Sequence, residues 1–213
     1  MGGRITIPNL HKALFVSCNY FDTMLLQFHQ QTVDNFLIPS FSLTKGEIVI
    51  INLPNGSFFR PIELTLIDIF TGKTSNDKID IEASFKYAEH FRESWFRGHF
   101  FPMTVGTYLN RNANKTNPVY KKIYDMPWMT PKIKVQTLAG NPRRQLSIYT
   151  TLSWTSNLIF DLAGVDPQGG QDIYDFVKTI VQQGGSAILF DWSDEFKNDC
   201  TTFTQAEYLG DKV

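Results

Sequence analysis

The segment 157–190 limits the fold of this chain more than any other, because it predicts two buried parallel strands joined by a helix. Residues 158–160 form an apolar run that ends at Asp161, and residues 186–190 form a second run. Strands that are apolar throughout are covered on both faces of a sheet, so the segment predicts an α/β class. Between the runs, apolar residues recur at the spacing of a helix that buries one face: Ile173, Phe176, Val177, Ile180 and Val181.

The first half of the chain adds further elements to that sheet. An apolar, β-branched run at 48–51 is typical of a buried parallel strand. The segment 91–128 is rich in aromatic residues and interrupted by prolines, which predicts an inserted, partly helical subdomain. Elsewhere we expect strands at 36–43 and 81–87, a loop at 52–60, and a helix at 62–70 that ends near Gly72.

The length and composition fit one globular unit. A chain of 213 residues, 42% of them hydrophobic, can bury a full core. We expect a single domain over residues 1–213. Its α/β core comprises residues 1–90 and 143–213 and carries a basic helical subdomain at 91–142.

The charge is distributed unevenly along the chain. Residues 111–144 hold eight Lys or Arg and one acid, a charge of +7, which leaves −8 for the rest of a chain whose net charge is −1. Such polarity favours docking on an anionic surface, whether headgroups, RNA or an acidic protein. The alternative is that these residues lie in solvated loops and that their charge is incidental.

Cysteine content and hydropathy exclude some functional classes. Cys18 and Cys200 belong to no CxxC pair, so a structural metal or a disulfide framework is not expected. No apolar run approaches the roughly 20 residues that span a bilayer. Any contact with a membrane is therefore expected to be peripheral.

The stretch after the run at 48–51 resembles the phosphate-binding loop of ABC-type ATPases. Residues 40–49 are similar to the strands that lead into that loop, and its opening is matched by Pro54, Asn55, Gly56 and Ser57. A working loop continues with Gly-Lys-Ser/Thr, which hold the phosphates and magnesium. Here Phe58, Phe59 and Arg60 follow instead. Arg60 is the cation of this stretch that can still touch a phosphate.

The catalytic acids of the family are only partly matched. Asp161 resembles the Walker B acid that holds magnesium, and Asp166 resembles that of the following D-loop, but Leu162 stands at the position of the catalytic glutamate. The family's glutamine is missing from residues 85–90. His90 can substitute for it, although a lone histidine is more often a surface or core residue. Phosphoryl transfer depends on these groups, so the resemblance implies a chain that does not hydrolyse ATP, with no cofactor and no stable metal.

Two further segments resemble elements of the family's helical subdomain. Phe101 and Pro102 are similar to the start of that subdomain, near the groove that receives membrane subunits in transporters. With Lys121 and Lys122 they are our candidates for partner docking. A degenerate signature motif is matched by Leu138, Ala139, Gly140, Arg143 and Arg144. The two arginines can equally belong to a solvated face.

Within this family the chain is most similar to the ATPase subunit of the cytochrome c maturation (haem exporter) system. The similarity lies in its length, the Ala-Gly-x-x-Arg-Arg signature and residues 183–185 before the last apolar run. It implies a catalytically inactive scaffold subunit bound to integral membrane proteins. Its location would be peripheral on an inner membrane, on the mitochondrial matrix side or the bacterial cytoplasmic side.

Two other functions remain open. The chain can be an ATP-binding transporter subunit that needs an intact ATPase partner, and ATP affinity would then appear only in the heterodimer. It can also be a nucleic-acid or membrane-surface binding module, since aromatic residues stand beside Lys and Arg between 95 and 134. No RNP-like motif is present in the sequence, and nucleic acid is not the expected partner.

Overall fold

A five-stranded parallel sheet forms the centre of the molecule. The computed structural model describes residues 23–93 and 100–210, so Cys18 lies outside the described residues. The two apolar runs of segment 157–190 are neighbouring parallel strands, which confirms the predicted α/β class. The strand order is β10 (Thr202–Gln205), β5 (Ile48–Asn52), β9 (Ser186–Asp191), β8 (Asn157–Asp161) and β7 (Lys86–Tyr87).

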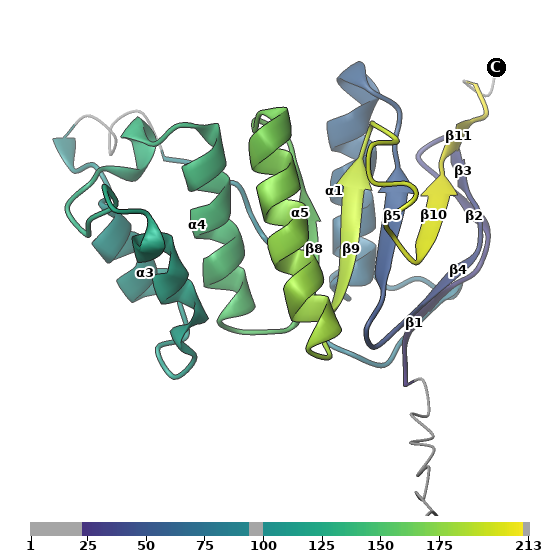
Figure 1. Ribbon diagram of the computed structural model, residues 1–213. Coiled ribbons are helices and arrows are strands. Elements are labelled where there is room, and N and C mark those ends of the chain that lie inside the picture. Colours follow the sequence, from purple (N-terminus) through teal and green to yellow (C-terminus); the bar gives the residue numbers. More distant parts are fainter. Residues whose placement is uncertain (1–22, 94–99, 211–213) are drawn as a thin grey trace, which may run out of the picture.

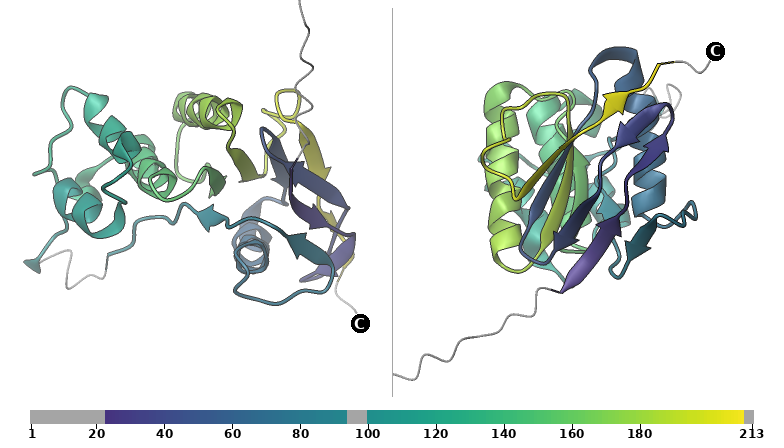
Figure 2. Two further views of the ribbon diagram at one scale, coloured as in Figure 1. Left: turned by 90° about the horizontal axis from the view of Figure 1, so that it is seen from below. Right: turned by 90° about the vertical axis from the view of Figure 1, so that its right-hand side faces the viewer.

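Helices cover both faces of this sheet. Helices α4 (Gly140–Leu152) and α5 (Pro167–Gln182) pack on one face, and α1 (Phe59–Phe70) packs on the other (Figures 1 and 2). Because each face has its own apolar cluster, β9 is buried at every residue. Helix α1 ends as expected, with Gly72 just beyond it at a φ of 72°.

Short antiparallel strands flank the α1 face. The ABC-type fold that the sequence resembles implies a parallel sheet with such an N-terminal antiparallel β part, and this expectation is confirmed. One small sheet has the order β4 (Phe41–Thr44), β1 (Met24–Phe28) and β6 (Ile79–Ile81). A second has the order β11 (Glu207–Tyr208), β3 (Phe36–Ile38) and β2 (Gln31–Val33). Asp34 and Asn35 connect β2 to β3 with φ values of 46° and 66°, which these two residue types tolerate in a tight hairpin.

Three predicted boundaries were wrong. The strand expected at 36–43 is divided between β3 and β4, which belong to different sheets; Pro39 lies at the break and lacks a backbone donor. The strand expected at 81–87 is likewise split between β6 and β7. The loop expected at 52–60 contains a 3₁₀ turn, η1 (Gly56–Phe58), and the start of α1.

The helical subdomain has a small core of its own. It contains α3 (Val105–Asn112) and two 3₁₀ segments, η2 (Pro118–Asp125) and η3 (Val135–Thr137), and it extends beyond α4 on the side away from the antiparallel strands (Figure 1). Leu146 of α4 packs into this core, while Ile148 packs against the sheet. Helix α4 therefore ties the subdomain to the sheet. Within the described residues, no helix has the length and apolar character needed to cross a bilayer.

Candidate functional site

Asp161 is the centre of a buried polar network at the carboxyl end of β8. Its side chain has no exposed surface. Pairing of the parallel strands brings the ends of β5, β9 and β8 to one sheet edge, where Asn52 pairs with Asp191 and Asp161 with Phe190. Ligands of open α/β sheets bind at this edge. Asp161, which resembles the acid that holds magnesium, therefore lies where a ligand site of this fold is expected.

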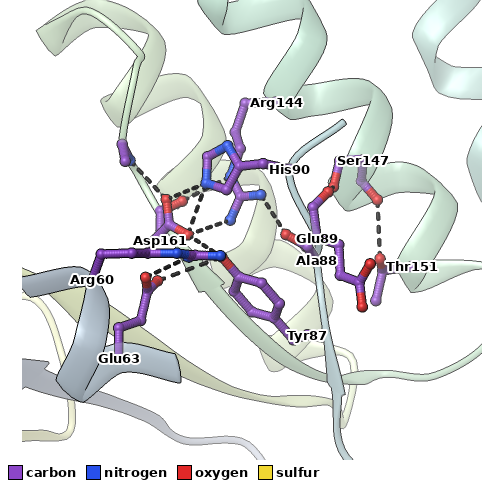
Figure 3. Close-up of polar contacts among 11 residues, drawn as sticks. Arg60, Glu63, Tyr87, Ala88, Glu89, His90, Arg144, Ser147, Thr151 and Asp161 are labelled. Carbon is purple, nitrogen blue, oxygen red and sulfur yellow. Dashed lines mark hydrogen bonds and ion pairs between the residues drawn. The ribbon is translucent and has the colours of Figure 1, made fainter. Parts of the chain in front are cut away.

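Donors from three other elements surround the Asp161 carboxylate (Figure 3). The Tyr87 hydroxyl donates to Oδ2 at 2.5 Å, and Nη2 of Arg144 donates to the same oxygen at 3.2 Å. His90 Nε2 lies 2.8 Å from Oδ1 and must be a donor there, because a carboxylate only accepts. The backbone N–H of Ala163 also donates to Oδ1, at 2.8 Å. Both carboxylate oxygens thus carry hydrogen bonds from the chain itself.

Helix α4 supplies the cation of this network. Arg144 is 2% exposed, and its Nε donates to the backbone oxygen of Asp161 at 2.9 Å. Its Nη1 donates to the carbonyl of Ala88, and Ser147 of the same helix donates to the carbonyl of Glu89. These bonds hold the segment after β7 against α4. They thereby fix the position of His90.

The charges of the network set the ionisation of its acid. Burial alone would raise the pKa of Asp161, but the Arg144 guanidinium and the hydrogen bond from His90 outweigh it and hold that pKa well below its usual range. For Tyr87, burial and then the negative charge of Asp161 raise the hydroxyl pKa. Asp161 is therefore an anion and Tyr87 a neutral donor at neutral pH.

A second buried carboxyl, Glu63, lies on α1 beside the first. Its side chain is 1% exposed, and Oε2 accepts from Arg60 Nη1 at 2.6 Å. The Tyr87 hydroxyl lies 3.4 Å from Oε1 and also accepts from Arg60, at 3.1 Å. Burial, followed by the charge of nearby Asp161, raises the pKa of Glu63 to about 7. Glu63 is therefore a carboxyl that can change charge near neutral pH.

The starts of α4 and α5 interlock beside this network. Asn141 donates to the Asp166 carboxylate at 2.8 Å, and the backbone N–H of Asp166 donates back to the Asn141 side chain at 3.1 Å. Asp166 also caps α5 by accepting from the N–H of Gly169, at 2.8 Å, and this bond lowers its pKa. A Cβ at Gly140 would lie 1.8 Å from the carbonyl oxygen of Gly164. The close contact of the two helix starts therefore depends on glycine.

The sequence matches no protein-family model and no curated protein. Among solved structures, a chain described as a metal-chelate type ABC transporter, in an inward-facing conformation, aligns with a TM-score of 0.67 at 18% identity, over 89% of this chain and 82% of that one. A nucleotide-free ATP-binding cassette of an ABC transporter aligns with a TM-score of 0.61 at 18% identity, over 87% and 88%. The chain has the fold of an ABC-type ATP-binding cassette.

A third cassette agrees with this assignment. It comes from Clostridium perfringens, where it is part of an ABC transporter complex, and it aligns with a TM-score of 0.61 at 14% identity, over 87% of this chain and 86% of that one. At such identities the likeness is one of fold. The order of elements argued from the sequence is therefore supported independently of any single motif.

The stretch that resembles the cassette's phosphate-binding loop is a short 3₁₀ turn with an aromatic contact at its end. Asn55 accepts from the N–H of Gly56 at 2.7 Å and begins the 3₁₀ turn that contains Ser57. Phe58 is 47% exposed and packs on Tyr208, with ring centres 5.3 Å apart. Arg60 is directed to Glu63 and Tyr87 (Figure 3). Neither of its described hydrogen bonds goes to the loop that begins at Pro54.

The residues proposed for the degenerate signature separate into two groups. Leu138 is buried, and its carbonyl accepts from Arg143, whose side chain folds back over the segment before α4. Ala139 precedes α4 as its N-cap residue. Arg144 instead joins the Asp161 network. It is 2% exposed and its guanidinium nitrogens donate to buried oxygens, so the alternative of a solvated face is wrong for this arginine.

The predicted docking residues lie on different elements of the subdomain. Phe101 is 75% exposed and adjoins the half-buried Pro102. Lys121 and Lys122 are exposed on η2, where the Lys122 ammonium lies 5.5 Å from the Phe176 ring centre. The structure therefore leaves these side chains accessible but does not gather them into one contact.

Two contributors to the site were missed from the sequence. Glu63 occupies the buried stripe of α1 with Ile62, Leu66 and Phe70. A charged residue in an apolar stripe was the available signal. Tyr87 had no such signal, since its role depends on β7 lying beside β8. No three His, Cys, Asp or Glu side chains gather as a metal centre within the described part of the chain.

Proposed function

We propose that this chain is a non-hydrolysing ABC-type cassette that acts as a scaffold subunit of a membrane protein complex. The observation that carries the proposal is the state of Asp161. The acid that resembles the magnesium ligand accepts hydrogen bonds from three side chains and one backbone N–H of its own chain. The Arg144 guanidinium already neutralises it.

The chemistry of magnesium explains why this state disfavours hydrolysis. Mg²⁺ requires oxygen ligands at about 2.0–2.1 Å in a near-octahedral arrangement. Both oxygens of Asp161 face hydrogen-bond donors, which would have to move before a cation could approach. Leu162, at the position of the family's catalytic glutamate, belongs to the apolar cluster of the sheet. A side chain without a polar group cannot activate water.

The partner class follows from the fold and from the surface of the subdomain. Two of the similar structures belong to an ABC transporter and to an ABC transporter complex. Phe101 and the lysines of η2 offer an exposed apolar group and positive charge. We propose that integral membrane subunits dock there, with the chain peripheral on a mitochondrial or bacterial inner membrane. The signature at 139–144 favours the cytochrome c maturation branch.

Two measurements test this proposal. The first is purification of the untagged complex from detergent-solubilised membranes, followed by sizing and mass spectrometry; we expect a large, salt-resistant assembly that contains integral membrane proteins. Recovery as a free monomer or with nucleic acid would contradict the scaffold role.

The second measurement is Mg-ATP binding and turnover by the isolated chain, with Asp161→Asn as the matched variant. We expect neither binding at micromolar ATP nor turnover in either protein. Micromolar binding that Asp161→Asn abolishes would refute the inactive assignment. Affinity that appears only after mixing with an intact ATPase subunit would favour a transporter heterodimer instead.

A further inference from the structure

A pocket of about 400 Å³ opens on the outer side of the Arg60–Glu63 pair. It lies between α1, the segment that follows β7, and α3. Its volume is within the range of small-molecule sites, which is roughly 300–1,000 Å³. The pocket does not include Asp161 or the loop that resembles the phosphate-binding loop.

The lining combines positive charge with an aromatic wall. Phe91 and Tyr108 meet edge to face, with ring centres 5.9 Å apart. Two acids also line the pocket, Asp68 and Glu89, and Lys73 is paired with Asp68 at 3.3 Å. The remaining basic lining residues are Arg60, His90 and Arg92. The composition suits an anionic group on an apolar body.

Arg60 is the cation that reaches from the network into this pocket. Its side chain is 36% exposed. Both of its described hydrogen bonds, to Glu63 and to Tyr87, come from Nη1, and its buried Nε has no hydrogen-bond partner among the residues that the structure describes. A guanidinium has five N–H donors and binds a carboxylate through two parallel bonds. Because Nε is buried, a two-bond contact with the carboxylate of a ligand would use Nη2 and Nη1, and Glu63 occupies Nη1.

Glu63 is the internal competitor for Arg60. It is buried beside Asp161, so two carboxyl groups share one low-dielectric site. Asp161 is kept ionised by its donors, which leaves Glu63 as the carboxyl that takes a proton; its pKa of about 7 agrees. The groups that face Glu63 are Arg60 of α1, Tyr87 of β7 and Asp161 of β8. Asp161 is in turn bound by His90 of the segment after β7 and by Arg144 of α4.

We propose that this pocket binds a small organic acid whose carboxylate replaces Glu63 on Arg60, while Glu63 takes up one proton. One ion pair is broken and one is formed, and the covalent change is the O–H bond that Glu63 gains with a proton given up by a solvent or buffer acid. The apolar body of the acid packs on Phe91 and Tyr108. This site requires neither ATP nor a membrane partner, so its test is independent of the proposed scaffold function.

The test uses benzoate as the probe and the neutral benzamide as its control. Titration calorimetry of the full chain at pH 6 and pH 8 should give benzoate binding about tenfold weaker at pH 8, because one proton enters a group that titrates near pH 7. At pH 8, buffers of different ionisation enthalpy should show uptake of close to one proton per benzoate. Benzamide should not bind.

Variants test whether benzoate binding and its pH dependence come from Arg60 and Glu63. Arg60→Gln should weaken benzoate binding at least about tenfold, as expected for loss of a charged hydrogen bond. Glu63→Gln should keep the binding but abolish its dependence on pH. Arg111→Gln, at the exposed end of α3, is the control and should match the wild type.

Each outcome decides the inference. Equal affinity at pH 6 and pH 8, equal binding of benzamide, or wild-type binding by Arg60→Gln would overturn it. If Arg60→Gln fails to fold by its melting curve, Arg60→Lys keeps the charge without the guanidinium fork. Lysine should then still weaken benzoate binding, and unchanged binding would contradict the proposed contact.

Discussion

The network at the sheet edge contains the same pair of groups twice, in two different surroundings. Arg144 and Asp161 are 2% and 0% exposed, whereas Arg60 and Glu63 are 36% and 1% exposed. Tyr87 lies between the pairs, with its ring centre 5.8 Å and 5.9 Å from the two guanidinium carbons. The inner acid has many donors and a strongly lowered pKa, while the pKa of the outer acid is raised. A buried carboxylate thus keeps its charge where several hydrogen-bond donors surround it, and tends to take up a proton where they do not.

The largest effect is expected from breaking the inner pair, Arg144 and Asp161. Arg144→Ala leaves the Asp161 carboxylate buried without its cation, which should lower the free energy of unfolding by about 3–5 kcal/mol. Urea denaturation at pH 7 measures this loss. Arg143→Ala is the matched control; it removes a half-buried neighbour that binds loop carbonyls, and we expect a loss of about 1 kcal/mol.

A double variant separates charge from packing in that result. Arg144→Met with Asp161→Asn removes both charges and keeps much of the volume, so it should recover part of the lost stability. If Arg144→Ala unfolds no more readily than Arg143→Ala, the inner pair does not hold α4 on the sheet.

The second prediction concerns the helix that carries Arg144. Gly140→Ala places a methyl group 1.8 Å from the Gly164 carbonyl oxygen. The start of α4 must therefore move away from the segment that precedes α5. We expect a loss of about 2–3 kcal/mol in the free energy of unfolding, as for an overpacked core. Gly170→Ala in α5 is the control, because its nearest neighbour would be 3.7 Å away and the change should be close to neutral. Equal effects in the two variants would be inconsistent with the interlock.

The third prediction concerns the outer pair, Arg60 and Glu63, and the effect of pH on stability. The pKa of Glu63 is raised from 4.5 to about 7 in the folded chain, so the folded state binds more protons than the unfolded state between these values. At this group the free energy of unfolding therefore falls as pH rises from about 4.5 to 7, by roughly 2–3 kcal/mol. Asp161 acts in the opposite sense, since its stabilisation is lost at acid pH.

Glu63→Gln should remove the neutral-pH part of this dependence. We expect the variant to be more stable than the wild type by roughly 3 kcal/mol at pH 8 and nearly equal to it at pH 4.5, measured by urea denaturation at both values. Glu82→Gln, an exposed acid, serves as the control and should change nothing. A wild type whose stability is the same at pH 5.5 and pH 8 would show that Glu63 stays ionised.

The two pairs also differ in how far the sequence could predict them. Arg60 and Glu63 are three residues apart on one helix, so their contact follows from helical spacing. Arg144 and Asp161 are 17 residues apart, and their contact depends on how α4 packs over the end of β8. The sequence predicted the strand that ends at Asp161. It could not predict that the arginine would be directed inward.

The fold was more predictable than the site because its signals are local and repeated. The apolar composition of each run, at 48–51, 158–160 and 186–190, predicts a buried strand. Strand β10 was missed, since its four residues include three polar ones and it is held by pairing with β5. His90 was undervalued for a similar reason: its importance comes from the segment that Ser147 holds in place.

The smallest effect on stability is expected from Phe101, which lies outside both pairs. Its side chain is 75% exposed, so Phe101→Ala should change the free energy of unfolding by less than about 0.5 kcal/mol. The same variant should release the chain from detergent-solubilised membrane complexes at lower salt, because an exposed aromatic group contributes most when a partner covers it. Trp154→Ala, another exposed aromatic, is the control. Equal retention of the two variants would place the docking surface elsewhere on the cassette.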